Sequence, residues 1–142
     1  MKIKKVRENA TLPTKGSVSA AGFDLYACMD AEETIPPRRG IKIPTGIAAA
    51  IPFGFFGGIY ARSGLATKQG LRPCNCTGVI DADYRGEIIV ALFNDSDEER
   101  TIAPNDRVAQ LVIQPYADVN LEEAESLDET DRGKDGFGST GV

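Results

Sequence analysis

Histidine is absent from this chain of 142 residues, and its absence removes several kinds of catalytic site. Ser-His-Asp and Cys-His catalysis need an imidazole that accepts and returns a proton. H-E-x-x-H metalloproteases and histidine-ligated zinc deaminases need the same ring as a metal ligand. Any catalysis by this chain must therefore use carboxylates, hydroxyls and arginines, with an oxygen-bound metal such as magnesium where a metal takes part.

Cysteine is scarce, and basic residues are outnumbered by acidic ones. Cys28, Cys74 and Cys76 are odd in number and form no C-x-x-C, so they fit reduced thiols better than a disulfide framework or a zinc site. The net charge of -5 leaves no basic face for the phosphates of a strand, which argues against a nucleic-acid partner. A single small anionic ligand held by a few arginines and lysines remains compatible with this charge.

Long apolar runs are also missing. No run approaches the roughly 20 residues that are needed to span a bilayer. Residues 1–6 alternate like a strand and lack the apolar core of a signal peptide. The sequence therefore predicts a cytoplasmic protein of one domain, residues 1–142, with no membrane partner.

What the chain does contain is short apolar or alternating runs between frequent glycines and prolines. Many short strands at such spacing are typical of an all-β sandwich, barrel or jelly roll. One short helix is predicted over Ser63–Gln69, with Ser63 as its N-cap and Gly70 as its C-terminal stop. The predicted strands cover residues 2–6, 23–27, 40–44, 47–51, 55–61, 87–93, 100–102 and 107–115.

Residues 78–88 are the stretch in which we expect the chemistry. They predict a hairpin, with an apolar strand, a polar tip bracketed by Gly78 and Gly86, and a second strand through residues 87–94. The second strand is almost continuously apolar, so we expect both of its faces to be buried. Asp81 and Asp83 are two apart and would point the same way in an extended chain. The alternative interpretation is a solvated turn, since turns favour Asp.

Three other stretches place polar residues among apolar ones. Asp24 lies in an alternating strand, where we expect it to face solvent or a neighbouring chain. Arg62, Ser63 and Gly64 stand where a strand leads into a helix, which suits either a phosphate cradle or ordinary capping. Gln110 lies inside an apolar run, so its amide is either a structural hydrogen-bonder or a ligand reader.

The character of the chain changes near its end. Residues 121–131 are acidic and weakly apolar, and residues 132–141 carry four glycines. Composition alone fits a disordered tail. The alternative is a lid that orders on a nucleotide, because glycines let backbone N–H groups approach an anion, arginine clamps phosphate and phenylalanine covers a flat ring. The segment is not a Walker A loop, because the G-K-[ST] ending is missing.

Taken in order, these stretches resemble the trimeric dUTP pyrophosphatase (dUTPase) family over about residues 16–142. The resemblance implies a distorted β jelly roll (a β-clip) and a homotrimer with active sites between subunits. It also implies a β core at residues 1–127 and an arm at residues 128–142 that closes a neighbouring subunit's site. The motifs are A-G-F-D-L-Y-A at 21–27, A-R-S-G-L-A at 61–66, G-V-I-D-A-D-Y-R-G-E-I at 78–88, D-R-V-A-Q-L-V-I at 106–113 and R-G-K-D-G-F-G-S-T-G at 132–141.

The family activity that this resemblance implies is hydrolysis of dUTP to dUMP and pyrophosphate, which keeps uracil out of DNA and supplies dUMP for dTMP synthesis. Asp81 resembles the general base that holds the water attacking the α-phosphorus. Asp24 resembles the acid near the sugar and the metal-bound waters, and Gln110 the amide near the phosphates and that water. Mg²⁺ would bind through the triphosphate and waters, with no direct protein ligand.

The remaining site residues are also carried over by resemblance. Tyr84 resembles the ring that packs under deoxyribose and excludes a ribose 2′-hydroxyl. Asn75 and the backbone around Gly78 resemble the uracil reader, and Phe137 the lid over uracil. The residues that resemble phosphate ligands are Arg62, Ser63, Gly64, Arg132, Ser139 and Thr140.

The chain departs from the commoner family pattern in three places. Tyr60-Ala61 stands where many members carry Ala-Pro, cysteines flank Asn75, and Lys134-Asp135 occupies a place of smaller residues. Two rivals remain: a dCTP deaminase-like enzyme, which would release ammonia, and a dUTPase-fold protein used for nucleotide binding or signalling. The second would be expected to lack Asp81, Tyr84 or the tail, and the sequence retains all of them.

Overall fold

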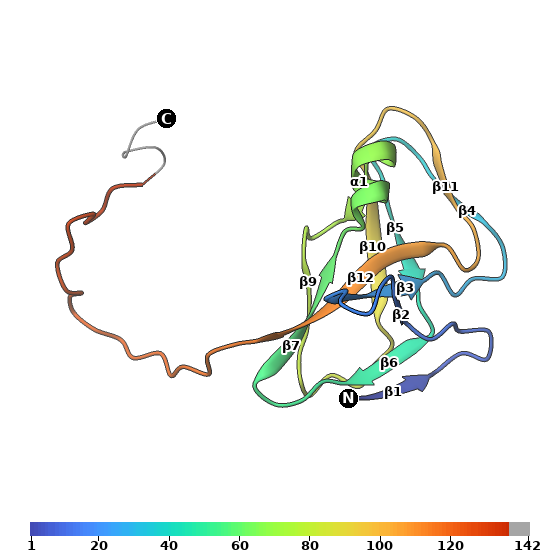
Figure 1. Cartoon of the computed structure of the whole chain (residues 1–142). Helices are drawn as coiled ribbons and strands as arrows, with labels where there is room; N and C mark the ends of the chain where they lie inside the picture. Colours follow the sequence, from blue (N-terminus) through green and yellow to red (C-terminus); the bar gives the residue numbers. More distant parts are fainter. Residues whose placement is uncertain (137–142) are drawn as a thin grey trace.

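The computed structural model describes residues 1–136 and consists of short strands with one short helix (Figure 1). This confirms the all-β class. The helix is α1 (Ser63–Gln69). The strands are β1 (Lys2–Lys5), β2 (Thr14–Lys15), β3 (Gly22–Tyr26), β4 (Glu33–Ile35), β5 (Gly40–Pro44), β6 (Ile47–Ala50), β7 (Phe55–Tyr60), β8 (Leu71–Pro73), β9 (Gly78–Ile80), β10 (Ile89–Asn94), β11 (Arg100–Ile102) and β12 (Arg107–Pro115).

Two sheets make up most of the body. A five-stranded sheet has the order β2-β3-β12-β7-β9, and a three-stranded sheet has the order β5-β10-β8. The pairs β1-β6 and β11-β4 complete the sheets that residues 1–136 form. Neighbouring strands are antiparallel and mostly distant in sequence, which is typical of jelly-roll connections.

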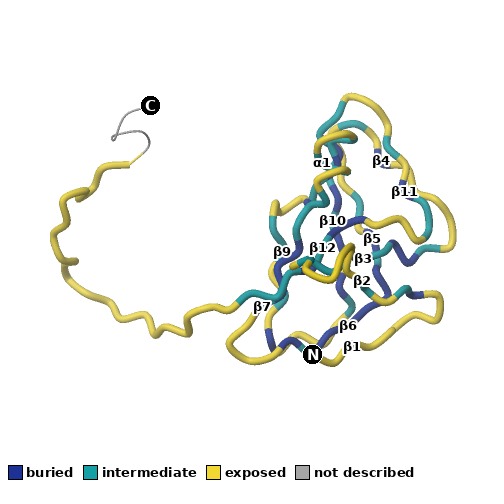
Figure 2. The backbone as a smooth tube through the Cα atoms, viewed as in Figure 1, coloured by how far each residue is buried: buried dark blue, intermediate teal, exposed yellow. Residues whose placement is uncertain are grey.

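The apolar core draws one face from each of these sheets. Leu25 and Leu111 come from the five-stranded sheet, Ile43 and Leu92 from the three-stranded sheet, and all four are fully buried. Figure 2 shows the buried segments concentrated within the strands of the body. The two-residue period of a strand explains this pattern, because alternate side chains point to opposite faces.

Strand β10 corrects one prediction. We expected both faces of this apolar strand to be buried, but Val90, Leu92 and Asn94 are buried while Ile89 is 48% exposed. The exposed face lies on the surface of the single chain. Hydrophobicity alone could not tell a strand buried in its own chain from one with an uncovered apolar face.

The predicted hairpin at residues 78–94 is also wrong. Strand β9 pairs with β7, whereas β10 pairs with β5 and β8. Residues 81–88 therefore cross from one sheet to the other instead of turning back on β9. Gly78 begins β9 and so is part of the strand rather than turn punctuation. Pairing partners are set by contacts far along the chain, and the local pattern does not contain them.

Helix α1 has the predicted bounds, and Gly70 ends it in the left-handed conformation with φ 68°. The predicted cap at Ser63 is wrong, because Ser63 is the first helical residue and Arg62 occupies the cap position without a side-chain cap bond. The short strands β2, β4 and β8 were not predicted. With two or three residues each, they are too short for a periodic pattern.

Beyond β12 the chain leaves the body as an extended segment, coloured orange to red in Figure 1. Every residue from 116 to 136 is exposed (Figure 2). In the described part of the chain, no helix is long and apolar enough to cross a membrane. The predicted site residues Phe137, Ser139 and Thr140 lie outside the described residues.

Candidate functional site

A row of polar residues crosses the five-stranded sheet. Gln110 on β12 is directly opposite Asp24 on β3 and Tyr60 on β7. Directly opposite residues on antiparallel strands share a face, so the register brings these three side chains to one side of the sheet. Arg62 follows β7 by two residues and reaches the same row.

Asp24 is buried in its own chain, so the solvent-facing alternative is wrong, while the alternative that it faces a neighbouring chain stays a prediction. Arg62 donates from Nε to Asp24 Oδ1 at 2.8 Å, and Arg107 donates from Nη1 to Asp24 Oδ2 at 3.4 Å. A buried carboxylate needs such partners, because an unpaired buried charge is costly. Asp24 thus fixes Arg62 at the start of α1 and anchors Arg107 beside it.

Gln110 makes the structural hydrogen bond that was one of its two predicted roles. Its Nε2 donates to the carbonyl of Ala61 at 2.9 Å. Its Oε1 lies over Gly22, where an added Cβ would come within 2.6 Å. Gly22 therefore leaves the space that the amide occupies, and the amide ties β12 to the strand end that carries Arg62.

Ser63 and Gly64 are exposed at the start of α1. A Cβ added at Gly64 would meet nothing within 4 Å, so the space in front of this turn is open. The first N–H groups of a helix have no partner inside the helix. Arg62, Ser63 and Gly64 therefore form one continuous edge of donors next to Asp24.

A second group of predicted residues lies on the other edge of β7. The turn between β8 and β9 carries Asn75, and Asn75 Nδ2 lies 3.6 Å from the position of a Cβ on Gly78. Gly78 pairs with Ile59, and Ile80 pairs with Gly57. Strand β9 thus runs along β7 with Asn75 and Gly78 at one end and Asp81 just past the other.

Asp81 begins a tight turn. The N–H of Tyr84 donates to the carbonyl of Asp81 at 3.1 Å, so the chain is not extended here. The two-residue period of an extended chain, on which the prediction for Asp81 and Asp83 was based, therefore does not apply here, although both side chains border one hollow. Asp81 and Tyr84 line one hollow of ≈ 210 Å³ together with Val79.

Asp81 also borders a larger hollow of ≈ 630 Å³, which Asp83 shares. Aromatic and aliphatic side chains make up the rest of its wall. Phe53 is 85% exposed and Val79 60%. The remaining residues that line this larger hollow are Phe56, Ala82 and Tyr116.

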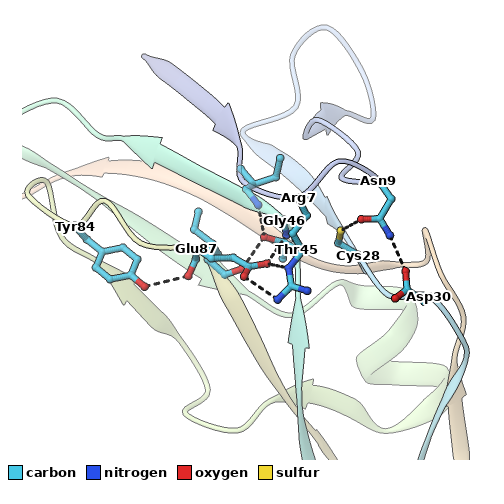
Figure 3. A network of polar contacts seen from close by, with 10 residues as sticks. Arg7, Asn9, Cys28, Asp30, Thr45, Gly46, Tyr84 and Glu87 are labelled. Atoms are coloured by element: carbon cyan, nitrogen blue, oxygen red, sulfur yellow. Dashed lines mark hydrogen bonds and ion pairs between the residues drawn. The ribbon is translucent and has the colours of Figure 1, made fainter.

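Figure 3 shows the polar contacts of Tyr84 and Glu87, which follow Asp81 in the chain. Arg7 donates from Nε and Nη2 to the two carboxylate oxygens of Glu87, at 2.8 and 3.1 Å. The N–H of Gly46 donates to Glu87 Oε1 at 2.7 Å, and the Tyr84 hydroxyl donates to the Glu87 carbonyl at 3.0 Å. The Arg7 hydrogen bonds, opposed by desolvation and aided by the Gly46 N–H, lower the pKa of Glu87.

The Tyr84 ring has a fixed place in this network. It lies across Gly86, where an added Cβ would come within 2.4 Å of the hydroxyl oxygen. A side chain at position 86 would therefore displace the ring from this place. Tyr84 is held at its hydroxyl by Glu87 and remains 44% exposed beside Asp81.

The two groups of site residues do not meet within one chain. Strands β3 and β9 are three spacings apart in the sheet, about 14 Å at roughly 4.8 Å each. Along β7, the row at Tyr60 and the Gly57–Ile80 pair are three residues apart, which adds about 10 Å. Asp81 lies one residue further on, so it is remote from Asp24 and Arg62 of its own chain.

Arg132 is likewise not brought to either group. It lies in the exposed extended segment, where its Nε donates to the carbonyl of Asp135 at 3.1 Å. Figure 1 shows this segment leading away from the body. A chain alone thus presents three separate parts of the predicted site.

The positions of the acidic side chains bear on the predicted magnesium ion. Residues 1–136 contain no group of three or more His, Cys, Asp or Glu side chains that could hold a metal ion. Both oxygens of Asp24 are engaged by arginine. Magnesium binding through the triphosphate and waters, with no direct protein ligand, stays a prediction.

Three residues that organise these groups were not predicted from the sequence: Arg107, Arg7 and Glu87. Arg107 is the charged first residue of the strand that carries Gln110, and this was its only signal. Arg7 and Glu87 are 80 residues apart in sequence, and no local pattern connects them. Long-range ion pairs of this kind follow from the fold.

The fold and these groups define a class. The chain is a jelly-roll-like all-β protein with a carboxylate beside a tyrosine, and with an arginine held by an acid at a helix start, a donor arrangement that suits an anionic ligand such as phosphate. The dUTPase family model matches residues 8–141, and the chain belongs to the dUTPase family.

Sequence relatives agree with this membership. The chain is 49% identical to the deoxyuridine 5'-triphosphate nucleotidohydrolase of Syntrophotalea carbinolica, over 99% of this chain and 96% of that protein. It is 46% identical to the enzyme of the same name from Oryza sativa subsp. japonica, over 100% of this chain and 81% of that protein.

A solved structure also agrees. A mutant of the Staphylococcus bacteriophage 80alpha dUTPase with dUpNHpp superposes with a TM-score of 0.90 at 28% identity, over 99% of this chain and 98% of that one. A mutant dUTPase from phage phi11 of S. aureus, described with a structural Mg(II) ion, has a TM-score of 0.80 at 25% identity, over 90% of this chain and 98% of that one. The predicted family and the jelly-roll-like fold are confirmed.

Proposed function

We propose how this chain carries out the reaction of its family, the hydrolysis of dUTP to dUMP and pyrophosphate, which keeps uracil out of DNA and supplies dUMP. Asp81 acts as the general base for the water that attacks the α-phosphorus. The observation that carries this proposal is the shared hollow of Asp81 and Tyr84 at the end of β9. An exposed carboxylate beside a fixed ring can hold a water in line with a bound phosphate.

The bound nucleoside lies along strand β9, with its base at one end and its α-phosphate at the other. Gly78 and Asp81 are three residues apart, about 10 Å in extended chain. That length suits a nucleoside whose uracil lies at Asn75 and Gly78 and whose α-phosphate lies at Asp81. Tyr84 then packs against C2′ of the sugar and leaves no room for a ribose 2′-hydroxyl, and Phe137 covers the uracil.

The triphosphate lies against the first group, the row of Asp24, Gln110 and Arg62. Arg62, Ser63 and Gly64 supply guanidinium, hydroxyl and backbone donors, while Asp24 and Gln110 hold the Arg62 strand end in place. Asp24 and Gln110 also face the sugar, the phosphates and the attacking water. Arg132, Ser139 and Thr140 of the tail contact the phosphates from the other side.

Mg²⁺ is the cofactor of this proposal. The ion would arrive with the triphosphate, and Asp24 would lie near the waters bound to it. Bound magnesium neutralises charge that develops on the phosphates. The chain's own residues orient the substrate, hold the attacking water and accept its proton, and positioning of this kind dominates phosphoryl transfer.

The complete site forms between subunits of a homotrimer. Three observations support this arrangement: the separation of Asp81 from Asp24, the exposed tail that leads away from the body, and the apolar wall beside Asp81. An exposed apolar patch of this kind marks a contact surface. The three free cysteines suit the cytoplasm as the place of action.

A panel of dUTP, dCTP, dTTP and UTP with magnesium tests the assignment. We expect pyrophosphate release from dUTP alone, without ammonia. Ammonia from dCTP would indicate the deaminase, and tight dUTP binding without turnover would indicate a binding or signalling protein. Either result would overturn the proposed reaction.

A further inference from the structure

The turn that carries Asn75 has an unusual backbone. Cys76 adopts φ 61° in the left-handed region, where residues other than glycine are uncommon. The N–H of Cys76 donates to the carbonyl of Pro73 at 3.1 Å, and that of Thr77 to the carbonyl of Asn75 at 2.6 Å. A turn with a residue in this conformation persists only when its surroundings hold it.

One guanidinium lies against this turn. Arg72 Nη1 donates to the carbonyl of Pro73 at 3.1 Å and to that of Cys74 at 3.4 Å, and it lies 4.0 Å from Cys76 Sγ. A single side chain thus contacts the residues on both sides of Asn75. The Cys74 N–H donates to the carbonyl of Ala91 at 2.8 Å, which ties the start of the turn to β10.

Arg72 is itself held by the neighbouring strand. Its Nη2 donates to Asp95 Oδ1 at 3.2 Å, and its Nε donates to Asp95 Oδ2. The Asp95 hydrogen bonds raise the pKa of Arg72. The guanidinium also lies 5.2 Å from the centroid of the Phe93 ring, within cation–π range.

We propose that Arg72 is a positioning residue for base selection. Its guanidinium holds the 73–76 turn in place, so that Asn75 meets the uracil edge in a fixed position. This inference rests on the proposed role of Asn75. Polar groups that discriminate bases must be fixed, because discrimination comes from donors or acceptors left unpaired by the wrong base. The planar fork of arginine lets one side chain bind Asp95 and the turn carbonyls together, which the point charge of lysine does not.

Arg72→Lys is the main test, with Asp95→Asn as a second variant that keeps Arg72 but removes the charge that anchors it. For both we expect kcat/KM for dUTP to fall about tenfold, mainly through KM. We expect the preference for dUTP over dCTP to fall about tenfold too, because Asn75 shifts. The preference for dUTP over UTP should be unchanged, since Tyr84 sets it from the other side.

Arg100→Lys is the matched control. Arg100 is also ion-paired, to Glu98 at 3.0 Å, and donates to a backbone carbonyl, that of Gln69, at 2.9 Å. Its partners lie outside the 73–76 turn. We expect this variant to keep both nucleotide preferences, whatever stability it loses in thermal unfolding.

Results that contradict the role of Arg72 can be told apart from results that contradict the role of Asn75. Wild-type base preference in folded Arg72→Lys and Asp95→Asn, with that preference lost in Asn75→Ala, would overturn the role of Arg72 alone. Wild-type preference in Asn75→Ala would overturn the proposed base reader itself. Equal loss of the dCTP and UTP preferences in Arg72→Lys would show general disorder of the site and would also overturn the inference. If Arg72→Lys does not fold, Asp95→Asn decides.

Discussion

Asp81 and Asp83 offer a comparison within one turn at the scale of single residues. Asp81 shares the hollow of Tyr84, whereas Asp83 borders only the larger apolar hollow. Asp81→Asn keeps the shape of the side chain but cannot accept a proton from water. We expect its kcat to fall at least about 100-fold while dUTP still binds.

Asp83→Asn is the matched control and should keep most of the activity. Steady-state pyrophosphate release and calorimetric binding of dUTP measure the two quantities separately. Near-normal turnover in Asp81→Asn with binding intact would place the base elsewhere.

Tyr84 makes the second residue-scale prediction. Its hydroxyl is bonded to the Glu87 carbonyl and its ring lies against Gly86, so we expect the ring to form a wall against C2′ of the sugar. Tyr84→Ala should raise kcat/KM for UTP relative to dUTP. Tyr84→Phe keeps the wall and should change this ratio much less, and an unchanged ratio in Tyr84→Ala would remove the steric role.

At the scale of elements, the Arg7–Glu87 ion pair ties the segment after β1 to the segment before β10. The pKa of Glu87 is lowered in the folded state, so its contribution to stability is present above its unfolded pKa of about 4.3. That contribution is lost as pH falls through the lower folded pKa, because the carboxyl protonates.

Glu87→Gln should therefore lower the free energy of unfolding at pH 7, and its difference from the wild type should shrink below about pH 4. Urea unfolding of both proteins at pH 7 and below about pH 4 measures this difference in the free energy of unfolding. Glu98→Gln removes a more exposed ion pair, with Glu98 75% exposed, and should change stability little at either pH. A Glu87→Gln deficit that is equal at both pH values would rule out the charged pair as its cause.

Elements with strong local signals were predictable from sequence. Helix α1 and its stop at Gly70 follow from local propensity, and β12 follows from a long apolar run. Strand pairing was not predictable, because β9 and β10 are consecutive in sequence yet belong to different sheets. The burial of Asp24 depends on the same long-range register, since its partners are Arg62, which follows β7, and Arg107, which begins β12.

The functional site, like the fold, was predictable from the sequence only in part. Motif resemblance selected the residues, but no local pattern contains the distance between Asp81 and Asp24. That distance depends on the order of four strands in one sheet. The Arg7 and Arg72 contacts likewise depend on which segments the fold brings together.

At the scale of the whole molecule, each complete active site of the proposed kind needs residues from more than one chain. Asp81, the Asp24–Arg62 group and the tail point to separate regions of a single chain, and an apolar wall beside Asp81 is left uncovered. The proposed homotrimer would resolve this separation, because under closed symmetry each subunit would supply a different part to each of several equivalent sites. The tail is the part whose origin is simplest to trace.

Two inactive proteins make the test. One carries Asp81→Asn with its tail, and the other ends after Asp131 with Asp81 intact. We expect each alone to stay near zero. Co-refolded in equal amounts, they should regain activity at about one site in four, since such a site takes Asp81 from one chain and the tail from the other.

Different affinity tags on the two proteins, purified in succession, isolate the mixed assemblies, and dUTP hydrolysis by these assemblies is the measurement that tests the shared site most directly. Recovered activity in mixed assemblies, with none in either parent, is the predicted result. Verified mixed assemblies that remain inactive would contradict the shared site and would assign the tail to the Asp81 of its own chain.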